Sequence, residues 1–351
     1  MNDFTTQQLR YTQIFIACIL VSLLYMLSQS ISGGIASFEA NLPGRALLIQ
    51  NFSRLRLKMG DRVFPVAVVG KDGWMELSVG YSMDVFQNIP TLPSGGSESI
   101  QKNLKILYDK LRERNITLVV VIVPVKSTIY PEMIPSEIHK IGPQPELDTL
   151  VDLLHKEGPP VLLDLRPALQ NARQKKQIYY KTDTHWNVYG AFTAYQEILN
   201  TLSPSYPELA PKNIKSFNIT VTPPYLHDIA KGIGANHILE NGYLLTIPQD
   251  DVNWIVYDDD TSVMKVATSS REKLPKLLMY HDSFGGYFLN KFLAPHFSQS
   301  TFILSTSTYP DTLTFKQIEA TKPDIVILEF VERNQFLLYN FLNNFGLEAE
   351  K

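Results

Sequence analysis

Two short stretches of the chain carry residue types that could perform nucleophilic catalysis. Asp183 and His185 are separated by one residue in KTDTHWN (181–187), so both side chains can point the same way in an extended loop. A carboxylate in that position can hold one imidazole nitrogen and leave the other free as a base. Ser283 lies in HDSFGG (281–286), where an apolar run meets two glycines and a strand-to-helix turn would expose the hydroxyl. A serine hydroxyl needs a base to take its proton, and His185 could be that base for Ser283 if the two stretches meet in the fold.

Each stretch also has an ordinary structural interpretation. Ser283 or Asp282 could merely cap the following helix, because both residue types are preferred N-caps. Asp-x-His pairs are often capping or surface residues. A metal site is the chemical competitor, since six side chains offer nitrogen or oxygen ligands: Asp183, His185, His227, Asp228, His281 and Asp282. None has the i, i+4 spacing of a helical zinc pair, so we expect no metal.

The elements around these stretches alternate between continuous apolar runs and amphipathic helical patterns. The expected strands are 116–124, 160–165, 275–280, 301–305 and 324–330, and the expected helices are 98–115, 151–158, 188–202, 285–297, 315–323 and 335–345. This alternation predicts an α/β fold with a doubly wound, mostly parallel sheet over 98–351 and an irregular insertion near 203–274. Ligands of such sheets bind beyond the carboxyl ends of the strands, which is where the polar clusters lie.

The first hundred residues form separate segments. The run 14–27 is strongly apolar, and extending it through residue 35 gives about 22 residues, enough to span a bilayer. We expect residues 1–36 to be an uncleaved membrane anchor, with a signal peptide cut after Ala36 or a buried core helix as alternatives. Residues 37–97 would form a membrane-proximal segment and linker, with helical spacing over 37–60 and strand–turn–strand at 68–77.

Composition excludes several classes of protein. The net charge is −3 and no basic stripe is interleaved with aromatic residues, so nucleic-acid binding is not expected. The single cysteine, Cys18, excludes intramolecular disulfides and Cys-based metal sites.

The same motifs carry a resemblance to a known family. The pattern D-x-H-x-N-x-x-G before a helix, and D-S after a buried strand, resembles the SGNH-hydrolase superfamily with its motifs in a circularly permuted order. More closely, the chain resembles the AlgX/AlgJ-like polysaccharide O-acetyltransferases of the alginate type. Seven pieces match in family order from about residue 38 to 334: FEANLPGRALLI, VVGKDGWMEL, VPVKSTIYPEMIP, TDTHWN, DIAKGIG, HDSFGG and KPDIVILEFVER.

The resemblance implies a reaction and its participants. Ser283 would be the nucleophile, His185 the base and Asp183 its orienting partner. The enzyme would accept an acetyl group from a membrane-bound acyltransferase outside the cytoplasm and pass it to an exported polysaccharide, with no dissociable cofactor. A carbohydrate acetylesterase with the same triad, or an inactive scaffold of a polysaccharide export complex, are the alternatives.

The chain departs from the superfamily at the block that usually supplies an oxyanion-stabilising Asn. EFVERN (329–334) has no GxND, so backbone N–H groups around Ser283–Gly285 would do much of this work, with Arg333 and Asn334 as further candidates. Arg333 could instead pair with a neighbouring glutamate. The remaining expectations concern four side chains: Trp186 to stack on a sugar or pack under a helix, Lys126 to line the acceptor groove or lie on a solvated loop, Tyr287 to be core, and His281 to be buried and hydrogen-bonded.

Overall fold

The computed structural model describes residues 44–246, 252–258, 263–306 and 313–349, with residues 13, 16–17, 19–22 and 24–25. The chain divides into two compact units, 1–60 and 61–351. Helix α2 (Arg45–Lys58) lies in the first unit and begins after Gly44, whose φ of 77° is left-handed. Within the described ranges, no helix is long and apolar enough to cross a membrane. The expected anchor over 1–36, with Cys18, falls almost entirely outside those ranges and stays a prediction, as does the division into domains.

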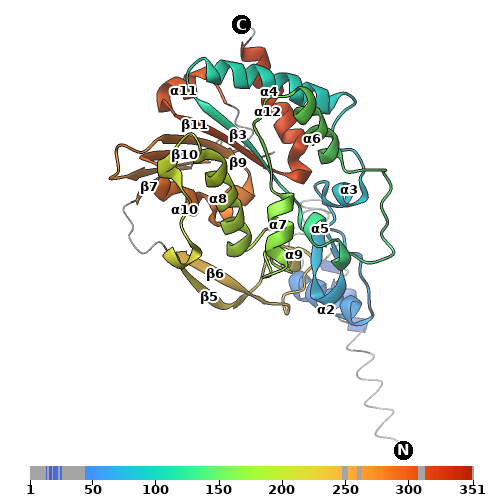
Figure 1. The fold of residues 1–351 in the computed structure, drawn as a ribbon. Coiled ribbons are helices and arrows are strands. Elements are labelled where there is room, and N and C mark those ends of the chain that lie inside the picture. Colours follow the sequence, from blue (N-terminus) through green and yellow to red (C-terminus); the bar gives the residue numbers. More distant parts are fainter. Residues whose placement is uncertain are drawn as a thin grey trace, which may run out of the picture. The chain divides into compact units, whose positions relative to one another are not determined.

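The second unit is built on a seven-stranded mixed sheet (Figure 1). Its order is β4 (Leu162–Asp164), β3 (Thr117–Val123), β11 (Ile325–Val331), β9 (Lys276–His281), β10 (Gln299–Leu304), β8 (Val263–Ser269) and β7 (Val252–Asp258). The first five strands are parallel neighbours, as predicted, whereas β8 and β7 pair antiparallel.

The antiparallel edge differs from the sequence-based expectation. The segment expected to be an irregular insertion contains two regular strands, β7 and β8, of the main sheet. Side chains of β7 are largely exposed, among them Ile255, Val256 and Tyr257. An edge strand therefore lacks the continuous buried apolar run by which the central strands are recognised.

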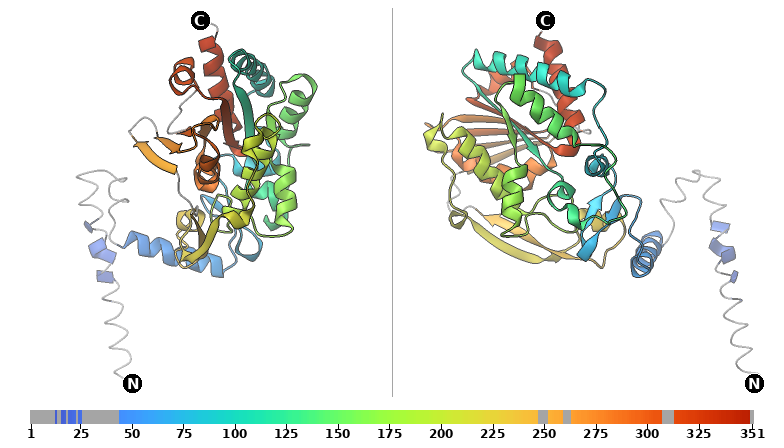
Figure 2. Two further views of the ribbon diagram at one scale, coloured as in Figure 1. Left: turned by 60° about the vertical axis from the view of Figure 1, so that its left-hand side comes forward. Right: turned by 45° about the vertical axis from the view of Figure 1, so that its right-hand side comes forward.

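Helices cover both faces of the sheet (Figure 2). Along β3, Val119, Val121 and Val123 face one apolar core, while alternate residues such as Val120 and Ile122 face the other. The first core also holds α7 (Arg166–Arg173), α8 (Val188–Leu202) and α10 (Asn290–Leu293). The second holds α4 (Gly96–Arg112), α6 (Glu146–Glu157), α11 (Phe315–Thr321) and α12 (Gln335–Ala349). Because strand side chains alternate, a continuous apolar run supplies both cores at once.

Smaller elements complete the unit. The hairpin of β1 (Ala67–Val69) and β2 (Met75–Leu77) confirms the predicted strand–turn–strand, with Asp72 and Gly73 at φ 51° and 77° in the turn. A second hairpin joins β5 (Asn218–Tyr225) to β6 (Glu240–Thr246), with α9 (Asp228–Gly232) between them. The remaining helical turns are α3 (Ser82–Gln87), α5 (Lys126–Ile129), η1 (Lys71–Gly73), η2 (Pro131–Met133), η3 (Pro207–Leu209), η4 (Ile214–Ser216), η5 (Gly285–Leu289), η6 (Ala294–His296) and η7 (Glu332–Asn334).

One helix is broken where a single helix was expected. Residues 285–297 form the π-helical turn η5, then α10, then the 3₁₀ turn η6. Phe288 inside η5 has φ 70°, outside the right-handed helical region. A π-turn of this kind is typical of functional sites, and here it follows Ser283 directly.

Candidate active site

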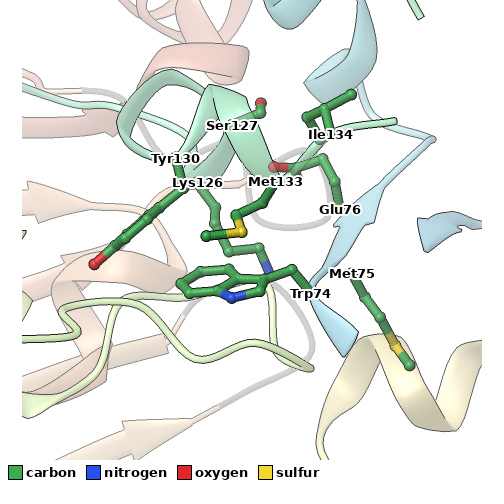
Figure 3. A pocket seen from close by; sticks show the side chains of 8 residues that line it. All are labelled: Trp74, Met75, Glu76, Lys126, Ser127, Tyr130, Met133 and Ile134. Atoms are coloured by element: carbon green, nitrogen blue, oxygen red, sulfur yellow. The ribbon is translucent and has the colours of Figure 1, made fainter. Parts of the chain in front are cut away.

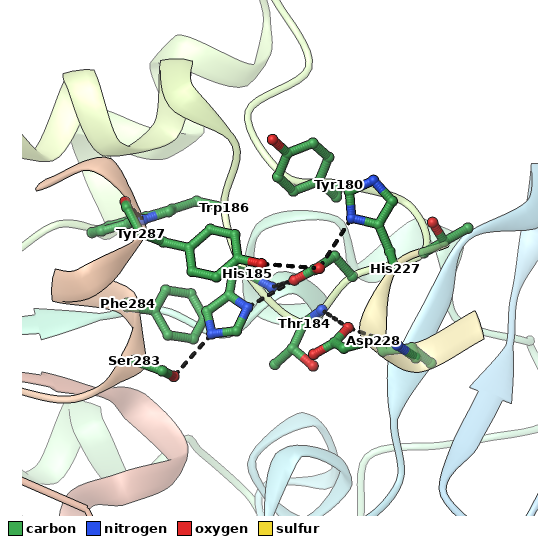
Figure 4. A network of polar contacts seen from close by, with 12 residues as sticks. Tyr180, Thr184, His185, Trp186, His227, Asp228, Ser283, Phe284 and Tyr287 are labelled. Atoms are coloured by element: carbon green, nitrogen blue, oxygen red, sulfur yellow. Dashed lines mark hydrogen bonds and ion pairs between the residues drawn. The ribbon is translucent and has the colours of Figure 1, made fainter. Parts of the chain in front are cut away.

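The structure brings Asp183, His185 and Ser283 into one hydrogen-bonded chain (Figure 4). His185 Nδ1 lies 2.7 Å from Asp183 Oδ1, and His185 Nε2 lies 2.9 Å from Ser283 Oγ. The Asp183 side chain is 2% exposed and that of His185 12%, while Ser283 is half-buried. A carboxylate buried behind the imidazole, with the hydroxyl toward solvent, is the arrangement that activates a serine for attack on a carbonyl.

The turn that carries Ser283 is held by two buried acids. Asp282 accepts hydrogen bonds from the N–H of Phe284 at 2.9 Å and from the N–H of Val331 at 2.8 Å. Glu329 Oε2 accepts from the N–H groups of Asp282 and Gly285 at 3.2 and 3.0 Å. Burial, aided by the nearby Asp282 charge, raises the pKa of Glu329 well above its usual range. Asp282 is therefore a structural anchor for the turn.

These contacts correct two of the predicted oxyanion donors. The Gly285 N–H is occupied by Glu329, and the Asn334 side-chain amide donates to Asp282 Oδ2 at 2.9 Å. A sequence pattern shows which groups can donate a hydrogen bond, but not that a buried carboxylate elsewhere in the fold already accepts it. The N–H of Ser283 itself has no acceptor in the part of the chain that the structure describes.

Arg333 remains available beside the nucleophile turn. Its guanidinium carbon lies 5.6 Å from the centroid of the Phe284 ring, and the residue is half-buried. Within the described ranges it forms no ion pair with Glu329 or Glu332, whose Oε2 atoms accept from other donors.

Lys126 holds the loop that carries the triad acid and base, rather than lining an open groove. It is 3% exposed, and its Nζ donates to the carbonyl oxygens of Tyr180, Lys181 and Asp183 at 3.2, 3.2 and 2.7 Å. Burial lowers the pKa of Lys126. Figure 3 shows the side chain beside Trp74 in a pocket against β2. The predicted role in acceptor binding is therefore replaced by a structural one.

Of the two aromatic residues near His185, Trp186 is the one in the core and Tyr287 is the one in contact with the histidine ring. Trp186 is fully buried, and its Nε1 donates to the carbonyl oxygen of Tyr287 at 3.0 Å, so it is not available to stack on a sugar. Tyr287, expected in the core, instead stacks on the His185 ring at 4.0 Å between centroids and 3° between planes. Its hydroxyl lies 3.5 Å from Asp183 Oδ2. The π-turn directs Tyr287 back toward His185, which helical periodicity could not indicate.

Asn187 caps the helix that follows the Asp183–His185 loop, and His281 is buried and hydrogen-bonded as expected from the sequence. Asn187 caps α8 through its side-chain oxygen, which accepts from the N–H groups of Tyr189 and Gly190. His281 is buried between the Asp282 carbonyl oxygen, 2.6 Å from Nδ1, and the Asn290 amide, 3.1 Å from Nε2. The cap fixes where the Asp183–His185 loop ends, because α8 begins at the next residue.

Two further residues reach the triad acid from the 227–232 segment. His227 Nδ1 lies 3.0 Å from Asp183 Oδ2, and Asp228 accepts from the N–H of Thr184 at 2.8 Å. From the sequence, both were possible metal ligands and Asp228 also belongs to the family-like piece DIAKGIG, but no local pattern places LHDIAKG beside KTDTHWN. Burial opposes ionisation of Asp183, but hydrogen bonds from His185 and His227 outweigh it and hold the pKa well below the usual range.

The same cluster of side chains could also supply ligands to a metal ion. Atoms of Asp183, His185 and Asp228 lie within 4.8 Å of one another. Both ring nitrogens of His185 are nevertheless engaged, one by Asp183 and one by Ser283. This engagement fits a serine triad better than a metal ligand set.

Comparison with known proteins identifies the class of domain. A family model described as the SGNH hydrolase-like domain of acetyltransferase AlgX matches residues 67–238. Probable alginate O-acetylase AlgJ of Pseudomonas putida is 27% identical over 177 residues, which is 47% of this chain and 41% of that protein. The corresponding protein of Pseudomonas syringae is 26% identical over 215 residues, 58% of this chain and 50% of that protein. The chain thus spans half or less of the length of these curated relatives.

Solved structures show the same fold. PatB1 of Bacillus cereus superposes with a TM-score of 0.58 at 18% identity, covering 79% of this chain and 99% of that one. The O-acetyltransferase domain of Pseudomonas putida AlgJ superposes with a TM-score of 0.51 at 17% identity, covering 80% of this chain and all of that one (100%). The resemblance to the SGNH hydrolase-like acetyltransferases of the AlgX/AlgJ type is thereby confirmed.

Proposed function

We propose that the protein is an extracytoplasmic O-acetyltransferase that moves an acetyl group, through an acetyl-serine intermediate on Ser283, onto hydroxyls of an exported polysaccharide. The observation that carries the proposal is the hydrogen-bonded chain from Asp183 through His185 to Ser283, with distances of 2.7 and 2.9 Å. The family match to an acetyltransferase domain supports acetyl as the group transferred. The curated relatives are named as alginate O-acetylases, which supports a polysaccharide as the acceptor.

The first half-reaction forms the acetyl-enzyme. Ser283 Oγ attacks the acetyl carbonyl carbon of the donor while its proton passes to His185 Nε2, 2.9 Å away. Asp183 keeps the proton on Nδ1 and stabilises the imidazolium that forms. The bond from the carbonyl carbon to the donor then breaks, and the leaving group takes the proton from Nε2.

The second half-reaction reverses the roles. A sugar hydroxyl gives its proton to His185 Nε2 and attacks the acetyl carbon, after which Ser283 leaves and recovers its proton. Each half-reaction passes through a tetrahedral oxyanion. We assign its stabilisation to the Ser283 N–H and the Arg333 guanidinium, since the neighbouring N–H groups of Phe284 and Gly285 are bound to acids.

Location and partners follow from the same proposal. Residues 1–36 would tether the domain to the membrane as a single-pass anchor, with the domain outside the cytoplasm, where an exported polysaccharide is accessible. A membrane-bound acyltransferase would supply the acetyl group. Protease added to the outer face of the cell membrane should then digest the domain without disruption of the cells.

The test is direct detection of the acetyl-enzyme. The full chain is incubated with 4-nitrophenyl acetate and analysed by intact mass and peptide mapping, with S283A and H185A in parallel. We expect one acetyl group on Ser283, none in S283A, and formation about 10²–10⁴-fold slower in H185A. Addition of polysaccharide fragments should speed loss of the adduct and yield acetylated sugar.

Other outcomes point to the competing functions. Loss of the adduct to water alone, with no acetylated sugar, indicates an esterase. A folded protein that forms no adduct indicates a scaffold. Adduct formation abolished by a chelator and restored by a divalent cation would indicate a metal site at Asp183, His185 and Asp228.

A further inference from the structure

The Asp183 carboxylate is shared by two histidines. Its Oδ1 accepts from the N–H and the Nδ1 of His185 at 2.9 and 2.7 Å, and its Oδ2 accepts from the Nδ1 of His227 at 3.0 Å. The two rings therefore bind different oxygens of the carboxylate, and Figure 4 shows both rings with their contacts as dashed lines. His227 is 1% exposed, so this second contact is made out of solvent. The triad acid is therefore fixed at both oxygens.

The other nitrogen of His227 also faces an oxygen. Its Nε2 lies 3.2 Å from the carbonyl oxygen of Glu240, a group that can only accept. An ionised Asp183 carboxylate can likewise only accept. Both ring nitrogens of His227 therefore satisfy their partners only when both carry hydrogen, which is the positively charged form of the ring.

The faces of the His227 ring are suited to a positive charge. The Tyr225 ring lies 4.1 Å away between centroids at 27°, and the Tyr180 ring 4.6 Å away at 39°. Aromatic faces attract a cation, and the adjacent carboxylate supplies the counter-charge that a buried cation requires. The hydrogen bonds and the ring contacts thus both favour the positively charged form of His227.

We propose that His227 is a positively charged positioning residue that fixes the Asp183 carboxylate and shares its negative charge with His185. This inference rests on the proposed function, in which His185 is the base. A permanent positive charge behind Asp183 opposes the gain of a proton by His185, so the base works at lower pH than one served by Asp183 alone. The other titratable groups around the cluster are Tyr180, Tyr225, Tyr287, Asp228, Glu240 and Lys126.

The test compares three variants of the full chain with the wild type. H227N keeps a neutral donor toward Asp183, while H227F keeps only a ring between the two tyrosines. H296N is the matched control, because His296 is also buried and contacts a tyrosine, with its Nε2 2.8 Å from the Tyr195 hydroxyl. Nitrogen-15 spectra of the histidine rings report which nitrogens carry hydrogen without any turnover. Acetyl-Ser283 formation over a range of pH gives the rate profile.

We expect both His227 nitrogens to carry hydrogen at neutral pH, and the acid limb of the H227N rate profile to move to higher pH. H227F should be slower at every pH, and H296N should leave the limb in place. A His227 ring with one N–H, or an H227N profile identical to the wild type, overturns the inference.

Failure of the proposed function would look different. Absence of acetyl-Ser283 from the wild type overturns that function alone. In that case the nitrogen-15 spectra test the inference about His227. We expect the His185 ring signals to titrate at higher pH in H227N than in the wild type, and titration at the same pH in both proteins would overturn the inference.

Discussion

Lys126 is the residue whose side chain most directly holds the proposed acid and base in place. One ammonium group donates to three carbonyl oxygens of the 180–183 segment, and the side chain has no room to move because it is buried. Buried carbonyl groups that lose a donor cost free energy, since water cannot replace it. The position of Asp183 thus depends on a lysine 57 residues away in the chain.

We predict that K126M lowers the free energy of unfolding by about 1–3 kcal/mol and slows acylation of Ser283. Methionine has a similar length but cannot donate to the carbonyl oxygens. Urea unfolding and the acylation assay measure the two effects. K105M is the control, because Lys105 is exposed and pairs only with Asp109 on the same helix. A K126M protein as stable and active as K105M would contradict the role assigned to Lys126.

At the scale of elements, the turn between β9 and α10 is constrained at one glycine and open at the next. A Cβ on Gly285 would lie 2.5 Å from the His281 Cβ and 2.7 Å from Glu329 Oε2. A Cβ on Gly286 would meet nothing closer than the His281 Cε1 at 3.9 Å. Because Gly285 has no Cβ, the Glu329 carboxylate can come close enough to accept a hydrogen bond from its N–H. A glycine is therefore required at position 285 but not at position 286.

The pair G285A and G286A tests this arrangement. We expect G285A to displace the nucleophile turn, lose about 1–3 kcal/mol of stability and form little acetyl-Ser283. G286A should stay within about 0.5 kcal/mol of the wild type and retain the adduct. Thermal unfolding and mass analysis of the adduct measure both. Equal tolerance at the two positions would show that the turn does not need the contact with Glu329.

At the scale of the whole molecule, two buried histidines set the response to acid. Burial lowers the pKa of His281 to about 4 and that of His296 to about 3. The unfolded chain takes up these protons near pH 6.5. Between about pH 6.5 and 4 these two histidines therefore bind more protons in the unfolded state than in the folded state, and their contribution to stability falls as the pH falls.

Over this window each histidine contributes a fall in the free energy of unfolding with acid, with a slope of up to about 1.4 kcal/mol per pH unit, whereas Glu329, whose pKa is raised, contributes with the opposite sign. H296N should remove the contribution of His296 and leave the others in place. Urea titrations at several pH values, for the wild type and H296N, measure the difference in slope. Parallel curves would mean that His296 is not held neutral in the folded protein.

The sequence alone determined the residue types and the elements that carry them. Local spacing made Asp183, His185 and Ser283 candidates and predicted the central strands, and the family resemblance of the motifs assigned the three residues to a triad. Helix α8 begins and ends at the predicted residues, because its cap, Asn187, lies next to it in the chain. Such short-range patterns follow from the side-chain periods of 2 residues in a strand and 3.6 residues in a helix, which depend only on residues near one another in the chain.

Only the tertiary structure decided what surrounds the triad. Lys126, His227 and Glu329 reach it from elements that are far apart in the chain, and Tyr287 turns toward His185 because of a π-helical turn. Gly285 does not serve as an oxyanion donor because a buried acid accepts from its N–H, and Trp186 takes the second of its two expected roles, since it is buried in the core and its Nε1 donates to a carbonyl oxygen. Such contacts depend on how elements pack and which polar groups are buried together, and no local sequence pattern records either.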